Sequence, residues 1–140
     1  KRPMVDNNVV LSRITKIREC LAILRRYALL PETSFLKSVD ISGNAERQLQ
    51  VAIQAVIDIG NHVISDMDVG AAKDYKDIFR ILAKHKIVST ALSRRLAAMT
   101  GLRNVLVHDY LEVDLRIVYR ILKKELVDFE TFIAAILKLV

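Results

Sequence analysis

The segment from Val51 to Ile59 limits the fold more than any other part of the chain, because it is apolar on nearly every side of a helix. Only Gln54 and Asp58 interrupt it. A helix that is apolar all round is buried on more than one face. We therefore expect a helix from about Asn44 to Met67 to lie at the centre of the fold, or between the core and a second subunit.

The rest of the chain has little material for turns, since it holds only 4 Gly and 2 Pro among 140 residues. Apolar residues recur at helical spacing in four further segments, and no strand-like alternation of useful length appears. The expected helices run from about Asp6 to Leu30, from Lys73 to His85, from the N-cap Ser89 to Val107, and from the N-cap Asp114 to Ile136. We predict an all-α, antiparallel bundle of about five helices, with Glu32–Gly43 as a loop and 108–113 as a connector.

The length suits one domain, which we expect to cover residues 4–140, with Met4 as a natural start and Lys1–Pro3 as an addition. Hydrophobic residues make up 52% of the chain. That share is high for so small a protein, in which much of the surface remains exposed. We therefore expect the chain to associate with a second copy of itself.

The net charge of +6 permits an anionic partner, although charges mixed along helix faces usually form an ordinary solvated surface. A single cysteine, Cys20, excludes an internal disulfide and a cysteine-based zinc cluster. Its helical spacing from Ile17 and Leu24 predicts a buried, unreactive thiol. Because no uninterrupted apolar stretch of about 18 residues and no signal peptide are visible, we expect a cytoplasmic protein with no membrane contact.

Two of the three histidines have ordinary structural explanations. His62 lies on the apolar central segment, where a hydrogen-bonded structural histidine is more common than a ligand. His85 stands at a helix end, where a cation offsets the helix dipole. The sequence contains no metal-site spacing such as His-x-x-x-His and no glycine-rich phosphate loop, so we expect neither a metal nor a cofactor.

His108 differs because a guanidinium, an amide and a phenol lie close to it in sequence, at Arg103, Asn104 and Tyr110. Arg103 and His108 are five residues apart, roughly 140° around a helix, so a regular helix does not bring them together. Either the helix ends near Val107 and the histidine folds back, or the site takes groups from two chains. The alternative is a solvated arginine, a cation at a helix end and an aromatic residue at a rim.

The run Arg103-Asn104-Val105-Leu106-Val107-His108-Asp109-Tyr110 resembles the Arg-polar-x-x-x-His-x-Tyr motif of HepT-like HEPN-domain toxins. Matching order and spacing extend from about Asn8 to Leu137. Four further segments are similar to the same family: 58–64, 75–79, 99–104 and 112–115. The resemblance therefore covers nearly the whole chain.

This resemblance implies a helical homodimer whose two motifs face each other across a cleft and cleave RNA without a metal. It implies an MNT-type nucleotidyltransferase as antitoxin, with no DNA partner. His108 would transfer protons and Arg103 would stabilise phosphoryl charge. Asn104 would orient a phosphate oxygen or His108. Tyr110 would hydrogen-bond the backbone or stack a base, and would receive an adenylate that blocks the cleft.

Two alternatives remain open from the sequence. The chain could be a non-catalytic HEPN module that binds a nucleotide or docks the nucleotidyltransferase. It could also be a structural dimerisation protein whose motif is only a helix end. An Arg103/His108 pair argues against a pure docking module, which has no need of an acid–base histidine beside an arginine.

Overall fold

The computed structural model describes residues 6–107 and 114–140, and within them it contains helices and no strand. The expected all-α class is confirmed. The helices of the described part are α1 (Asn7–Ala28), α2 (Glu32–Lys37), α3 (Val39–Met67), α4 (Tyr75–Lys84), α5 (Thr90–Val107), α6 (Leu115–Lys124) and α7 (Leu126–Leu137).

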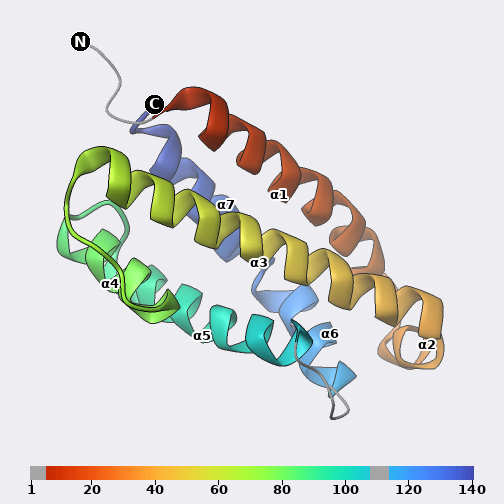
Figure 1. Ribbon diagram of the computed structural model, residues 1–140. Coiled ribbons are helices and arrows are strands. Elements are labelled where there is room, and N and C mark those ends of the chain that lie inside the picture. The colour runs from red at the N-terminus through yellow and green to blue at the C-terminus, as the bar shows by residue number, and fades with distance from the viewer. Residues whose placement is uncertain (1–5, 108–113) are drawn as a thin grey trace.

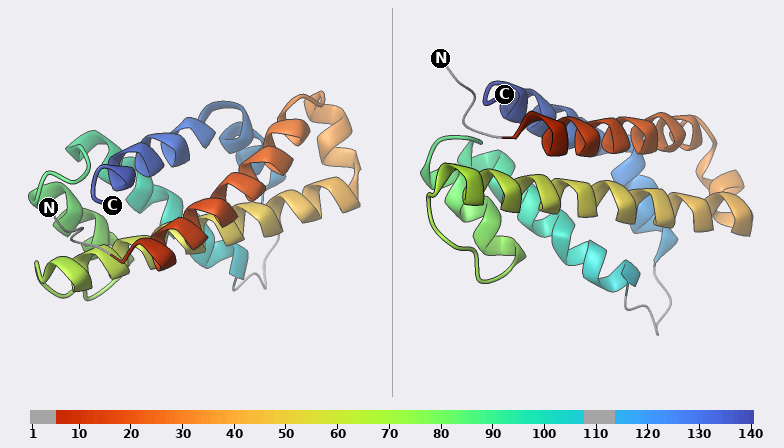
Figure 2. Two further views of the ribbon diagram at one scale, coloured as in Figure 1. Left: turned by 90° about the horizontal axis from the view of Figure 1, so that it is seen from above. Right: turned by 45° about the horizontal axis from the view of Figure 1, so that its top comes forward.

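Four of these helices form an antiparallel bundle in which α1 and α5 run away from the chain termini and α3 and α7 run back (Figure 1, Figure 2). The shorter helices α2, α4 and α6 lie at the turns between them. Helix α3 contacts α1, α2, α4, α5 and α6. It is therefore the central helix, as the all-round apolar segment predicts.

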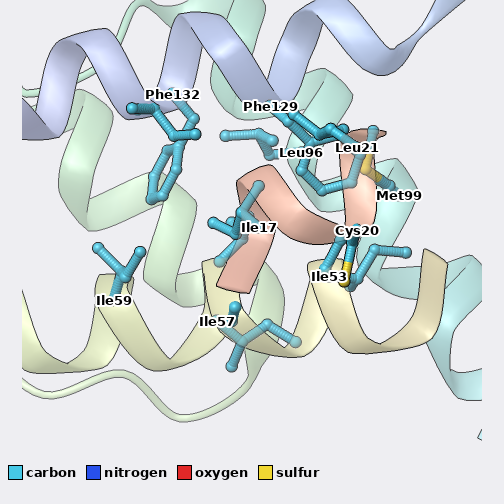
Figure 3. Packing of buried hydrophobic residues seen from close by; sticks show 14 of the residues in the cluster. Ile17, Cys20, Leu21, Ile53, Ile57, Ile59, Leu96, Met99, Phe129 and Phe132 are labelled. Carbon is cyan, nitrogen blue, oxygen red and sulfur yellow. The ribbon is translucent and has the colours of Figure 1, made fainter. Parts of the chain in front are cut away.

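One continuous hydrophobic core joins the long helices (Figure 3). Ile17 and Leu21 from α1, Ile53 and Ile57 from α3, and Phe129 from α7 are each at most 1% exposed. Side chains of this size each contribute about 1.5–3 kcal/mol when fully removed from water. The core thus holds together helices that are distant in sequence.

The predicted loop from Glu32 to Gly43 is wrong, because most of it is helical. Pro31 begins the short helix α2, whose Phe35 is completely buried against the ring of Tyr119, with centroids 5.3 Å apart. Ser38 then caps α3, since its Oγ accepts a hydrogen bond from the backbone N–H of Ile41 at 3.2 Å. The chain therefore changes direction at Ser38, where α2 ends and α3 begins, and not in a long loop.

The predicted single last helix is also divided, at Glu125, where α6 ends and α7 begins. The backbone of Glu125 has φ −115° and ψ −3°, outside a regular helix. Apolar residues keep helical spacing across the break, so the spacing alone predicts continuity. The break lets α6 contact α2 while α7 packs along α5.

Gly60 marks the closest approach of α3 to α4. A Cβ at this position would lie 2.5 Å from Cγ2 of the buried Ile78 and 3.7 Å from Cδ1 of Leu82. Only a glycine lets the two helices meet at this distance. The approach sets the position of α4, which in turn packs against α5.

Candidate functional site

The last two turns of α5 carry the first two residues of the predicted motif. Arg103 and Asn104 lie within this helix, which the structure describes as far as Val107, and Asn104 is exposed. The Arg103 side chain lies outside the described residues, as do His108 and Tyr110. The structure therefore places the helix that presents the motif, and brings Arg103 and Asn104 to one helix end.

Helix α5 is held at its start and along its middle. At its start, the backbone N–H of Leu92 donates to Ser89 Oγ at 3.0 Å, which confirms Ser89 as the cap. Further along, Leu96 and Met99 are buried in the core. Arg95 Nε donates to Asp128 Oδ1 of α7 at 2.9 Å. The helix that carries Arg103 is thus fixed by apolar packing and by an ion pair.

The chain re-enters the described part at Asp114, which caps α6 as the sequence predicts. Its Oδ1 accepts hydrogen bonds from the backbone N–H of Arg116 at 3.0 Å and from Arg116 Nε at 3.2 Å. These contacts, the backbone N–H first and then the guanidinium, lower the pKa of the Asp114 carboxyl from its usual value. A charged cap therefore fixes the start of α6.

The end of α5 and the start of α6 lie on the same side of the molecule, opposite to the two termini (Figure 1, and Figure 2, right). Residues 108–113 join these two ends. His108 and Tyr110 are therefore bracketed in sequence by two helix ends that the bundle holds in place.

The other two histidines occupy ordinary positions. His85 is the exposed C-cap residue of α4, which confirms its expected position at a helix end. His62 Nε2 lies 3.1 Å from Asp66 Oδ2 one turn further along α3. This nitrogen is shielded from solvent and its N–H direction forms no hydrogen bond, so the expected hydrogen bond is not made there.

Cys20 is 1% exposed and packs in the core, which confirms the expected burial (Figure 3). Burial raises the pKa of its thiol, and the smaller effect of Lys16 acts in the opposite direction. A thiol with a raised pKa holds little of the reactive thiolate near neutrality. The residue therefore contributes packing and no chemistry.

Within residues 6–107 and 114–140, no group of three His, Cys, Asp or Glu side chains is arranged to hold a metal ion. No helix of this part is both long and apolar enough to cross a membrane.

A basic surface next to the motif is the feature that sequence reasoning missed. Arg116, Arg120, Lys123 and Lys124 are all exposed on one side of α6, which we call the basic face of α6. The sequence could have predicted this face, because the other three cations follow Arg116 by four, seven and eight residues, and residues at such spacings share one side of a helix. The net charge alone does not distinguish this cluster from mixed surface charge.

Comparison with known proteins places this architecture in a family. The model of the family described as "Ribonuclease HepT-like" matches residues 17–136. An mRNA nuclease HepT of Shewanella oneidensis is 32% identical over 130 residues, covering 93% of this chain and 97% of that protein. A tRNA nuclease HepT of Aphanizomenon flos-aquae is 30% identical over 110 residues, covering 79% of this chain and 75% of that protein.

A solved structure gives the same result for the fold. It is the tri-AMPylated HEPN toxin of Shewanella oneidensis in complex with MNT antitoxin, which superimposes with a TM-score of 0.88 and 31% sequence identity. The match covers 95% of this chain and 99% of that one. The resemblance inferred from the Arg103–Tyr110 motif and its flanking segments is confirmed, and the chain belongs to the HepT-like ribonuclease family.

Proposed function

We propose that this protein is the toxin of a toxin–antitoxin pair, a metal-independent endoribonuclease that uses Arg103 and His108 and is silenced by a nucleotidyltransferase. The observation that carries the proposal is the intact motif at the end of α5 in a chain that matches the HepT-like family over residues 17–136. Two relatives are named as nucleases of mRNA and of tRNA, which supports RNA as the substrate class.

The chemistry follows from the two side chains. The RNA 2′-hydroxyl attacks the neighbouring phosphorus while His108 accepts its proton, and the 5′-oxygen leaves with a proton from a histidine. An imidazole with an ordinary pKa near 6.5 can exchange protons at neutral pH. Arg103 donates two parallel hydrogen bonds to the phosphoryl oxygens as their charge grows. The products carry a 2′,3′-cyclic phosphate and a 5′-hydroxyl.

A second copy of the chain completes this site in our proposal. Arg103 and His108 lie roughly 140° apart around an ideal helix, so one regular helix cannot aim both at one phosphate. A two-fold axis places the same patch of each subunit opposite itself, so two motifs can face one phosphodiester. Asn104, exposed on α5, is available to orient a phosphate oxygen or the imidazole.

Tyr110 is the proposed point of control. The Shewanella toxin is described as tri-AMPylated and in complex with MNT antitoxin. Adenylate on the Tyr110 hydroxyl would add negative charge and bulk where the RNA phosphate binds, and would block entry. Antitoxin and ATP should then label the parent protein with adenylate, while Tyr110→Phe should take up none. Equal labelling of Tyr110→Phe would exclude this tyrosine.

RNA cleavage by purified variants tests the catalytic assignment. We expect His108→Ala and Arg103→Ala each to reduce cleavage of total RNA by at least about 100-fold, the usual size of an acid–base or electrostatic contribution. His85→Ala and Arg94→Ala are matched controls, because they remove an exposed histidine elsewhere and an exposed arginine of the same helix. The controls should cleave like the parent.

Product analysis separates this proposal from its alternative. Cyclic phosphate ends should appear with the parent and disappear with His108→Ala. If His108→Ala keeps full activity, the histidine is not the acid–base group. If the parent binds the nucleotidyltransferase but cleaves no RNA, the non-catalytic docking module is the correct reading.

A further inference from the structure

The outer side of α6 carries a cluster of exposed cations that follows the motif in sequence. Its basic face carries four exposed cations within ten residues, beginning at Arg116 in the first turn. Asp114 and Glu125 flank these residues in sequence, but Asp114 already caps the helix and Glu125 is half-buried at the α6–α7 junction. The face is therefore strongly positive over its whole length of roughly 15 Å.

Two hydrogen bonds join this face to the end of α1. Tyr119 donates to the backbone carbonyl of Leu30 at 2.6 Å, and Lys123 Nζ donates to the carbonyl of Ala28 at 2.9 Å. These carbonyls lie at a helix end, where the helix itself supplies no hydrogen-bond donor. The contacts bring Arg25 and Arg26 of α1 beside the last turn of α6.

The junction of α1, α6 and α7 contains a groove of about 560 Å³. Four cations and five apolar residues line it: Arg25, Arg26, Lys123, Lys124, Ala28, Leu29, Leu122, Leu126 and Val127. The basic face of α6 thus leads from the motif side of the molecule into a basic groove.

Several of these cations are already engaged. Arg25 pairs with Glu130 at 3.2 Å, Arg116 pairs with Asp114 at 3.2 Å, and Lys123 binds the α1 carbonyl. Among the described residues, no acid pairs with Arg26, Arg120 or Lys124. These three exposed charges are available to an anionic ligand, and they span the face and the groove.

The groove also exposes apolar surface between its charges. Leu29 is 83% exposed and Val127 is 61% exposed. Exposed apolar side chains of this size do not stabilise the folded chain, but they can contact a ligand. Single-stranded RNA offers the matching chemistry, because its phosphates alternate with bases whose faces are open to apolar contact. A duplex hides those base faces and matches only the charges.

We propose that the basic face of α6 and the groove at its end bind the backbone of single-stranded RNA, and so hold the strand whose scissile phosphate lies at the motif. The inference rests on the proposed function for the meaning of that motif. Arg116 follows Tyr110 by six positions, so the face begins within about 22 Å of the motif along the chain. Arg120, Lys124 and Arg26 then follow as successive phosphate contacts.

Salt-dependent binding of a labelled, single-stranded oligouridine tests the proposal. The measurement uses His108→Ala protein, so that the probe stays intact. Each phosphate contact on a single strand contributes about 0.7 to the slope of log affinity against log salt concentration. The triple change Arg26→Gln, Arg120→Gln and Lys124→Gln should therefore lower the slope by about 2 and weaken binding by roughly tenfold or more at low salt.

A matched variant controls for the loss of three positive charges. Lys76→Gln, Lys84→Gln and Lys138→Gln removes three exposed cations elsewhere, and Lys84 ends α4 as Lys124 ends α6. This variant should keep the slope of the parent. Arg26→Lys with Arg120→Lys keeps the charges and should restore most of the slope, which separates electrostatic contact from a folding defect.

Three results would overturn the proposal. These are an unchanged slope in the triple variant, an equal loss of slope in the control variant, and equal affinity of the His108→Ala protein for duplex and single-stranded probes. An unchanged RNA slope with lost binding of the nucleotidyltransferase would instead assign the surface to an acidic protein partner. Because binding is measured on His108→Ala, failure here is distinct from failure of the parent to cleave RNA.

Discussion

Arg95 Nε of α5 donates a hydrogen bond to Asp128 Oδ1 of α7 over 2.9 Å, and the two partners differ greatly in exposure. The Asp128 side chain is 6% exposed, whereas that of Arg95 is 49% exposed. Loss of the arginine strands a buried carboxylate, but loss of the carboxylate leaves a cation that water can solvate. The loss of stability therefore depends on which partner of the pair is removed.

Removal of the two partners should have unequal costs. We expect Arg95→Met to lower the free energy of unfolding by about 2–3 kcal/mol and Asp128→Asn by about 1 kcal/mol. Urea unfolding followed by circular dichroism measures both. The exposed pair Arg13–Asp58 supplies the control, because Arg13→Met should cost less than about 1 kcal/mol. Equal costs for Arg95→Met and Asp128→Asn would contradict this account.

Substitution of Gly60 should destabilise the contact between α3 and α4. The new methyl group of Gly60→Ala meets Ile78 Cγ2 at 2.5 Å in a full core, and overpacking of this kind costs about 1–3 kcal/mol. Gly43→Ala, on the same helix with nothing within 4 Å, should instead gain about 0.5–1 kcal/mol from helix propensity. Thermal unfolding of both variants gives the comparison, and a stabilised Gly60→Ala would disprove the close approach.

Cys20 should be unreactive in the native protein. Burial raises the pKa of its thiol, so the thiolate that attacks alkylating reagents is scarce near neutral pH. We expect iodoacetamide to modify the protein only after denaturation in urea, as measured by intact mass. Rapid and complete alkylation without denaturant would show that the helices around Cys20 open readily.

The charge of Asp114 should stabilise the protein only above the pKa of its carboxyl. Contacts with Arg116 lower that pKa below the usual value of 3.8, so their stabilising effect is present above about pH 4 and is lost as the pH falls through the folded-state pKa. Asp114→Asn keeps a capping oxygen but no charge. Its melting temperature should lie below that of the parent near neutral pH and converge with it in acid.

High salt supplies the control for Asp114. The carboxylate and Arg116 are exposed, so screening should narrow the difference between parent and Asp114→Asn at neutral pH. A difference that persists at every pH and salt concentration would instead assign the effect to cap geometry.

RNA cleavage should survive removal of divalent metals. The proposed mechanism uses only His108 and Arg103, so excess EDTA should leave the rate within about twofold of the untreated rate. The same EDTA treatment of a metal-dependent ribonuclease is the positive control. Activity that EDTA abolishes and added metal restores would require a different site.

The sequence predicts the long helices well, because each carries an apolar stripe and a recognisable cap. Ser89 and Asp114 cap α5 and α6 as expected. Helix α2 escapes prediction because its six residues are too few to show a period, and only Phe35 among them is fully buried. The break at Glu125 escapes because apolar spacing continues across it while the backbone turns.

The candidate site, too, could be predicted only in part. The residue types and spacing in Arg103–Tyr110 predict the chemistry and the family, since those depend on local order in the chain. The basic face of α6 and its link to Arg26 depend on contacts between residues nearly a hundred positions apart, such as Lys123 with the carbonyl of Ala28. Spacing along one helix carries no information about that neighbour.

The helices on either side of residues 108–113 are attached to different parts of the bundle. Helix α5 is tied to α7 through Arg95, while α6 is tied to the end of α1 through Tyr119 and Lys123. Doubling the length of such a connection costs only about 0.6 kcal/mol in closure entropy. We therefore expect glycines inserted after Tyr110 to leave the melting temperature almost unchanged and to lower RNA cleavage, because they lengthen the connection between two helix ends whose positions the bundle fixes.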